Sequence, residues 1–196
     1  LPIVLDYRDA WTLSPRGLWN GHRNVELEES ALRAASVVTT VTDEISRQMR
    51  AAFPWFPADR ITTIPSGHDP SELPGPDPSL EEKGRFLLTH TGTFNDALPP
   101  SPVDRTPYFL IRAVAMLEPE FRHALRIRLV GTLGPAYRGF IAKQGVEYVF
   151  RILGAQSHRR ALQHQLAADA LLLIIYDTPT AAGDLTGKLV EYIGAR

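Results

Sequence analysis

Short apolar segments alternate along this chain with segments whose apolar residues recur every three to four positions. The apolar or β-branched runs predict buried strands at 2–7, 36–41, 61–64, 86–91, 126–130, 146–153 and 170–175. The periodic segments predict helices at 25–35, 42–53, 106–117, 136–144, 157–166 and, more briefly, around Leu189 and Ile193. Strands and helices that alternate at this spacing predict βαβ units. We therefore expect an α/β fold of Rossmann-like parallel sheets with flanking helices.

Some helices carry further signals about their ends and their buried faces. In the helix expected at 25–35, Leu27 and Ala31 lie on the apolar face. Three glutamates open this segment, where the helix dipole favours acidic side chains: Glu26, Glu28 and Glu29. Thr42 is placed to cap the next helix, whose buried face is expected to include Ile45 and Met49.

A proline-rich stretch between residues 69 and 84 interrupts the alternation. Its prolines at 70, 74, 76 and 78 leave no periodic pattern, which is typical of an extended connector. A chain of 196 residues is long enough for two small domains. We expect one lobe at 1–69, a linker at 70–84 and a second lobe at 85–196.

The composition changes this interpretation little. The chain is 44% hydrophobic and 22% charged with a net charge of -1, which is ordinary for a soluble globular protein and gives no basis for nucleic-acid binding. It has no cysteine, so disulfides and thiolate metal sites are excluded. The six histidines form no i, i+4 pair, and we expect no metal. The aromatic segment 53–57 is either a contact for a membrane or partner, or packs over a helix end.

The segment 183–193 near the end of the chain is the first candidate site. It follows the last apolar run, and the carboxyl ends of parallel strands are where open α/β sheets bind ligands. Lys188 lies at a helix start, where free N–H groups and the dipole favour an anion such as a diphosphate. Glu191 lies one turn further on the same face, where its carboxylate can accept ribose hydroxyls. The alternative is a surface ion pair between Lys188 and Glu191.

The loop after the strand at 86–91 is the second candidate site. Gly92 lets backbone N–H groups approach a phosphate, and Arg105 in the same loop can add a charge-assisted contact. The alternative is an ordinary turn glycine and a solvated arginine. After the first strand, Asp6 and Asp9 either serve an acceptor hydroxyl or cap the following turn.

Several enzyme classes lack their motifs in this sequence. There is no G-x-G-x-x-G after the opening strand and no Walker lysine motif, which argues against dinucleotide dehydrogenases and P-loop NTPases. The segment Ser-Gly-His-Asp at 66–69 contains the residue types of a catalytic triad, but neighbours in sequence do not form its relayed geometry.

Taken in order, these segments resemble bacterial glycosyltransferases of the GT-B fold, family 4-like. The resemblance covers nearly the whole chain and is carried by VLDYRDAW at 4–11, ASVVTTVTDE at 35–44, IPSGHD at 64–69, HTGTF at 90–94, RLVG at 128–131, AADALLL at 167–173 and TGKLVEY at 186–192. It implies two Rossmann-like lobes: part of the N-terminal, acceptor-side lobe and most of the C-terminal donor lobe. The chain begins without a methionine and stops early in the family's pattern, so we expect a piece truncated at both ends and inactive alone.

The resemblance also implies an activity and a set of site residues. Such an enzyme moves a sugar, typically a hexose, from a nucleotide-diphospho-sugar to a hydroxyl of a glycan, lipid-linked or small-molecule acceptor. It needs no cofactor or metal and works in the cytoplasm, in some cases at the inner face of the membrane. By position, Gly92 and Thr93 line the sugar-diphosphate pocket, Lys188 binds the phosphates, Glu191 binds the ribose, and the segment 153–155 with Gly154 at its centre lies against the base.

One departure from the family concerns catalysis. The position of the family's first glutamate, eight residues before Glu191, is occupied by Gly183. Either Asp184 or Asp177 substitutes for it, or the donor is handled differently; Asp184 and Asp9 are the candidate catalytic residues. Two alternatives follow: a nucleotide-sugar epimerase of the same fold, and a catalytically degenerate binding module.

Overall fold

The chain forms two compact units, each with its own parallel sheet. The computed structural model describes residues 1–14, 17, 19–94, 105–175, 181–183 and 185–195. The first unit comprises Leu1–Gly67 and Ile175–Gly187, and the second comprises His68–Ile174 and Lys188–Arg196. The sequence-based boundaries assigned the segment 175–187 to the second lobe, whereas the structure groups it with the first unit.

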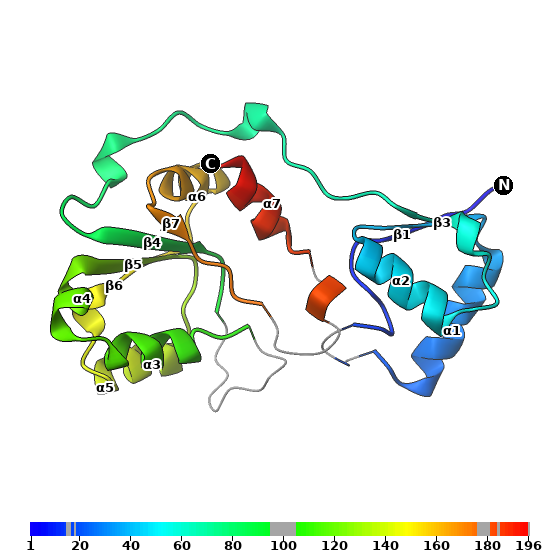
Figure 1. Cartoon of the computed structure of the whole chain (residues 1–196), viewed down its shortest axis with the longest axis horizontal. Coiled ribbons are helices and arrows are strands. Elements are labelled where there is room, and N and C mark those ends of the chain that lie inside the picture. Colours follow the sequence, from blue (N-terminus) through cyan, green and yellow to red (C-terminus); the bar gives the residue numbers. More distant parts are fainter. Residues whose placement is uncertain (15–16, 18, 95–104, 176–180, 184, 196) are drawn as a thin grey trace. The chain divides into compact units, whose positions relative to one another are not determined.

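The first unit has a three-stranded parallel sheet in the order β1-β2-β3, with two helices (Figure 1). Its elements are β1 (Val4–Tyr7), α1 (His22–Ala34), β2 (Val37–Thr40), α2 (Asp43–Ala52), β3 (Ile61–Thr63) and the short 3₁₀ helices η1 (Ala58–Arg60) and η5 (Ala181–Gly183). An apolar core that includes Leu32, Val38 and Met49 joins the sheet to both helices.

Helix α1 differs from its prediction in both its start and its buried face. It begins at His22, so no acidic residue lies in its first turn. Leu27 is 49% exposed, and Glu28 and Leu32 are buried instead. Glu28 is stabilised inside because its carboxylate accepts hydrogen bonds from the Thr12 N–H (3.1 Å) and the Thr12 hydroxyl. Hydrogen bonds from Thr12, which is distant in sequence, therefore favour burial of the helix face that carries Glu28.

Helix α2 confirms its predicted cap and buried face. Thr42 accepts a hydrogen bond from the Ile45 N–H at 3.1 Å, and Ile45 and Met49 are both buried. Phe53 and Phe56, from the aromatic segment 53–57, belong to the apolar core of this unit. Packing is therefore the main role of these two rings, while Trp55 between them stays 40% exposed.

The second unit has a four-stranded parallel sheet in the order β6-β5-β4-β7. Helices α3 and α5 cover one face of this sheet, and α6 and α7 cover the other (Figure 1). The elements are η2 (Pro70–Glu72), η3 (Pro78–Leu80), β4 (Phe86–Thr91), α3 (Tyr108–Met116), α4 (Pro119–Ala124), β5 (Leu125–Val130), α5 (Pro135–Lys143), η4 (Glu147–Val149), β6 (Phe150–Gly154), α6 (His158–Leu166), β7 (Ala170–Leu171) and α7 (Gly187–Gly194). These two sheets confirm the predicted α/β fold class.

Two predicted strands of this unit are shorter than the apolar runs that predicted them. The run at 146–153 begins with η4, so β6 starts only at Phe150. The run at 170–175 gives only β7 (Ala170–Leu171), an edge strand that pairs with β4 alone, and Ile175 is 52% exposed. An apolar run indicates that its side chains are buried, not that its backbone pairs with another strand. It therefore does not determine where a strand begins or ends.

Helix α4 was not predicted, whereas the other helices of this unit were. Ser157 caps α6 by accepting a hydrogen bond from the Arg160 N–H at 3.3 Å, and Gly145 takes a positive φ of 65° just after α5.

Within the described part of the chain, no helix is both long and apolar enough to cross a membrane.

Candidate functional site: the carboxyl end of β4

The strand order of the second unit creates a position suited to ligand binding. Strands β4 and β7 are neighbours, yet β4 leads to α3 on one face and β7 leads to α7 on the other (Figure 1). Open α/β sheets bind ligands at such a switch point, outside the carboxyl ends of the strands. Gly92 directly follows β4, and Lys188 lies in the first turn of α7. The fold thus brings together the two candidate sites that the sequence placed far apart.

Gly92 and Lys188 are in direct contact. A Cβ atom at Gly92 would lie 2.4 Å from Lys188 Cε and 2.9 Å from Lys188 Nζ, so the side chain of Lys188 occupies the space that any other residue would fill. Gly92 also has a φ of 142°, which favours glycine. Because Gly92 has no side chain, the Lys188 ammonium group has room to lie over the end of β4.

The charge of Lys188 is only partly compensated. Its side chain is half-buried, and burial lowers its pKa, as does the positive charge of Arg105, while Glu191 acts in the opposite direction. A bound anion would relieve both effects, because it would replace lost hydration and offset the repulsion between the two cations. This is the electrostatic environment expected of a phosphate-binding site.

His90 adds a neutral polar group that sequence reasoning did not single out. Its Nδ1 lies 2.9 Å from the Leu172 carbonyl oxygen, which can only accept, so Nδ1 carries the proton. Burial lowers the pKa of His90 to about 4, assisted by the charge of Lys188. Its Nε2 therefore keeps a lone pair, and no described residue hydrogen-bonds to it. The ring stacks on Phe94, with 4.4 Å between centroids.

The Nε2 of His90 and the Lys188 side chain lie near the same point. His90 Nε2 would lie 3.2 Å from a Cβ at Gly92, the same point that Lys188 approaches. The site thus offers an acceptor for a hydroxyl group beside a cation for a phosphate. The available sequence signal was a histidine near the end of a buried strand, two residues before a glycine, which by itself is weak.

Glu191 is positioned by a buried hydrogen-bond network that the sequence did not reveal. Gln165 of α6 donates to Glu191 Oε2 at 3.2 Å and to the Thr91 hydroxyl at 3.0 Å. The hydroxyl of Tyr192 accepts a hydrogen bond from the Thr91 N–H at 2.9 Å. These contacts fix α7 against the end of β4. Ile193, whose spacing helped to predict α7, is 63% exposed, whereas Tyr192 is buried.

The remaining predicted site residues are spread over both units. Thr93 is exposed next to the buried Phe94. Gly154 ends β6 with a φ of 71° and accepts a hydrogen bond from the Gly131 N–H at 2.8 Å. Asp9 is exposed in the loop after β1.

The other catalytic candidate, Asp184, and Asp177, the alternative substitute for the family's first glutamate, lie outside the described residues. Among the residues that are described, no group of three or more His, Asp or Glu side chains is arranged to hold a metal ion. The structure therefore places Gly92, Lys188 and Glu191 around the end of β4 and the start of α7.

Comparison with known proteins gives a clear structural match and no sequence match. No family model and no curated protein matches the sequence. The structure resembles that of Anabaena HepE in complex with UDP, with a TM-score of 0.74, 20% identity and coverage of 99% of this chain and 51% of that chain. It also resembles WaaG, a glycosyltransferase involved in lipopolysaccharide biosynthesis, with a TM-score of 0.68, 18% identity and coverage of 100% and 55%.

A third match has the same fold at still lower sequence identity. The trehalose-6-phosphate protein from E. coli bound with UDP-2-fluoro glucose has a TM-score of 0.66 and 14% identity, with coverage of 99% of this chain and 50% of that chain. The chain thus spans about half the length of the solved structures it resembles. Its two parallel-sheet units are therefore part of a GT-B fold, the fold of these glycosyltransferases.

Proposed function

We propose that this chain carries the donor-binding part of a glycosyltransferase, which moves a hexosyl group from a nucleotide-diphospho-sugar to an acceptor hydroxyl. The observation that carries the proposal is the contact between Lys188 at the start of α7 and Gly92 at the end of β4. It lies at the switch point of the sheet, and the Anabaena HepE structures of the same fold contain UDP and UDP-glucose.

In this proposal each polar group of the site has one task. Lys188, the first N–H groups of α7 and Arg105 hold the diphosphate and stabilise the negative charge that develops on it as it leaves. Glu191, held by Gln165, accepts hydrogen bonds from the ribose hydroxyls. His90 accepts a hydrogen bond from a hydroxyl of the sugar or from Lys188.

The other parts of the proposal rest on the family resemblance. Thr93 lines the same pocket, Gly154 lies against the base, and Asp184 and Asp9 are the candidate catalytic groups. The acceptor is a glycan, a lipid-linked or a small molecule. The reaction needs no metal and takes place in the cytoplasm, where the enzyme acts in solution or at the inner face of the membrane.

UDP titration by calorimetry tests the donor site directly. We expect Lys188→Ala and Glu191→Ala each to weaken UDP binding by about tenfold or more, because each removes a charge-assisted contact. Lys143→Ala and Glu147→Ala are matched controls, since both residues are exposed in the same unit and away from the site. Equal affinities in all four variants would contradict the site assignment.

Product analysis separates transfer from its alternatives. With a UDP-sugar and candidate acceptors, the full-length protein should form a glycoside, whereas this chain alone should bind the nucleotide and form none. Release of a free isomerised sugar nucleotide by the full-length protein would identify an epimerase. A full-length protein that binds no nucleoside diphosphate would favour a degenerate module.

A further inference from the structure

A second basic site lies in the same unit, in a cavity of about 200 Å³ between the sheet, α6 and η3. Four basic side chains line it: Arg128 from β5, Arg151 from β6, and Arg160 and His164 from α6. Ser79 and Gln156 add a hydroxyl and an amide. None of the residues around Lys188 and Gly92 lines this cavity, although Leu153, which precedes Gly154, does.

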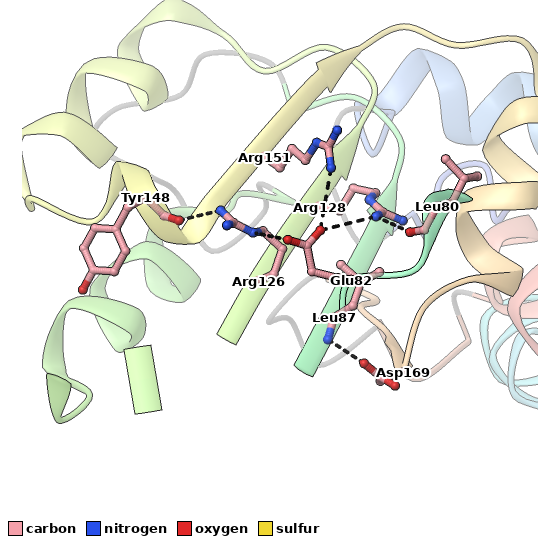
Figure 2. Close-up of polar contacts among 8 residues, drawn as sticks. All are labelled: Leu80, Glu82, Leu87, Arg126, Arg128, Tyr148, Arg151 and Asp169. Atoms are coloured by element: carbon pink, nitrogen blue, oxygen red, sulfur yellow. Dashed lines mark hydrogen bonds and ion pairs between the residues drawn. The ribbon is translucent and has the colours of Figure 1, made fainter. Parts of the chain in front are cut away.

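Arg128 is the centre of this site. Its side chain is only 1% exposed, and its Nη2 donates to the Leu80 carbonyl oxygen at 2.6 Å (Figure 2). Its Nε and Nη1 have no hydrogen-bond partner in the described part of the chain. Buried polar groups are almost always hydrogen-bonded, because leaving a charged donor without a partner is costly. Two guanidinium nitrogens without a partner among the described residues therefore indicate an acceptor other than those residues.

His164 of α6 repeats this pattern. It is 5% exposed, and its Nδ1 also lacks a hydrogen-bond partner among the residues described. Burial lowers its pKa to about 4, and the charges of three arginines, Arg128, Arg160 and Arg151, contribute in that order. The imidazole therefore lies in a positive electrostatic field.

Carboxylates only partly balance this charge. Figure 2 shows the Glu82 carboxylate among three guanidinium groups, at 3.2 Å from Arg126 Nε, 3.8 Å from Arg128 Nη2 and 3.7 Å from Arg151 Nη1. Asp77 accepts a bond from Arg160 Nη1 at 2.6 Å. Two carboxylates thus serve four arginines, and the burial of Arg128 keeps solvent from screening its charge.

We propose that this cavity binds a phosphate group, as inorganic phosphate or as a small phosphomonoester. Phosphate oxygens accept several hydrogen bonds at once, and the planar fork of arginine matches them in pairs. A cavity of about 200 Å³ is several times the roughly 30 Å³ that one water occupies, so it has room for a phosphate with a small organic group. With this cavity and the proposed donor site at Lys188, the second unit would bind anions at two places.

Calorimetric titration at fixed ionic strength and neutral pH tests this proposal with two probes, inorganic phosphate and glycerol phosphate. Arg151→Gln and Arg160→Gln, which change partly exposed side chains, should each weaken binding by about tenfold or more. Arg159→Gln is the matched control: it removes the same charge from an exposed neighbour on α6 and should leave binding unchanged. Lys188→Ala should also retain it, and circular dichroism checks that each variant is folded.

The pattern across variants decides the outcome. Binding that survives Lys188→Ala and is lost in Arg151→Gln supports the site, and tighter binding of glycerol phosphate identifies a phosphomonoester as its occupant. The proposal is overturned if neither probe binds, if Arg159→Gln weakens binding as much as Arg151→Gln, or if only Lys188→Ala abolishes it. The last result would place phosphate in the donor site. UDP binding tests the donor site by itself, so failure of one proposal leaves the other standing.

Discussion

Gly131 is required where two backbone segments meet behind the candidate donor site. It has a φ of 138°, and a Cβ atom there would lie 2.0 Å from the carbonyl oxygen of Gly92. A flexible side chain can move away from such a clash, but a backbone oxygen at the end of β4 cannot without disturbing the strand. This residue therefore sets the geometry that places Gly92 under Lys188.

Replacing Gly131 by alanine should destabilise the second unit by about 3 kcal/mol or more, because positive φ and backbone overlap both oppose a Cβ. Gly139→Ala is the matched control: no atom lies within 4 Å of its added Cβ, and it is inside α5. The control should gain about 0.5–1 kcal/mol from better helix propensity. Urea unfolding of both variants measures the difference, and equal effects would contradict the contact.

His90 should make stability depend on pH. Its pKa is about 4 in the folded state and 6.5 ordinarily, so between these values the unfolded chain binds more protons and stability rises with pH. The stabilisation is present above pH 6.5 and is lost as the pH falls. For His90 alone this loss amounts to about 2 kcal/mol between pH 7 and pH 5.

The free energy of unfolding at pH 7 and pH 5 checks this expectation. His90→Gln should reduce the pH dependence, because its amide can still donate to the Leu172 carbonyl but does not titrate. His123→Gln is a control from an exposed site on α4. An unchanged dependence in His90→Gln would show that His90 is not held neutral by the fold.

At the scale of elements, the predicted side-chain caps of α2 and α6 are confirmed. The cap of α2 depends on a local hydrogen bond, because Thr42 and Ile45 are close in sequence. The same hydroxyl of Thr42 also donates to the Gly183 carbonyl at 3.2 Å, and a Cβ at Gly183 would lie 3.0 Å from the Ile45 side chain. Helix α2 therefore holds η5, the short helix that precedes α7.

Thr42→Ala should lower the stability of the first unit by about 1–2 kcal/mol, because the Ile45 N–H and the Gly183 carbonyl both lose a partner. Thr42→Ser retains the hydroxyl and should cost much less. Urea unfolding followed by tryptophan fluorescence provides the measurement. A loss in Thr42→Ser as large as in Thr42→Ala would attribute the effect to the methyl group instead.

At the scale of the whole molecule, two separate apolar cores suggest two separate unfolding events. One core includes Leu32 and Met49, and the other includes Ile127 and Tyr137. All three tryptophans, Trp11, Trp19 and Trp55, belong to the first unit. Tryptophan fluorescence therefore reports on that unit alone, while far-ultraviolet circular dichroism reports on both.

Gly131→Ala should shift the transition seen by circular dichroism and leave the transition seen by fluorescence in place. Thr42→Ala, in the first unit, should move the fluorescence transition. Both variants are followed in urea by the two probes on the same samples. If both probes move together in both variants, the two units unfold as one and the separation is wrong.

Much of the fold could be predicted because its signals are local. Alternating apolar runs and helical periodicity gave the α/β class, and the caps at Thr42 and Ser157 were correctly placed. Gly92 and Lys188 were predicted as site residues because one follows a strand and the other begins a helix, which are also local features. Burial partners are not local, so the exposure of Leu27, the burial of Glu28 and the short β7 were missed.

The sequence by itself determined most of the strands and helices, because backbone preferences and apolar spacing act over a few residues. Only the tertiary structure decided that Lys188 packs on Gly92, that Gln165 holds Glu191, and that Arg128 is buried with unused donors. Those contacts depend on the strand order β6-β5-β4-β7, which brings distant segments together. Long-range burial, rather than local preference, thus set the charges and hydrogen bonds of both candidate sites.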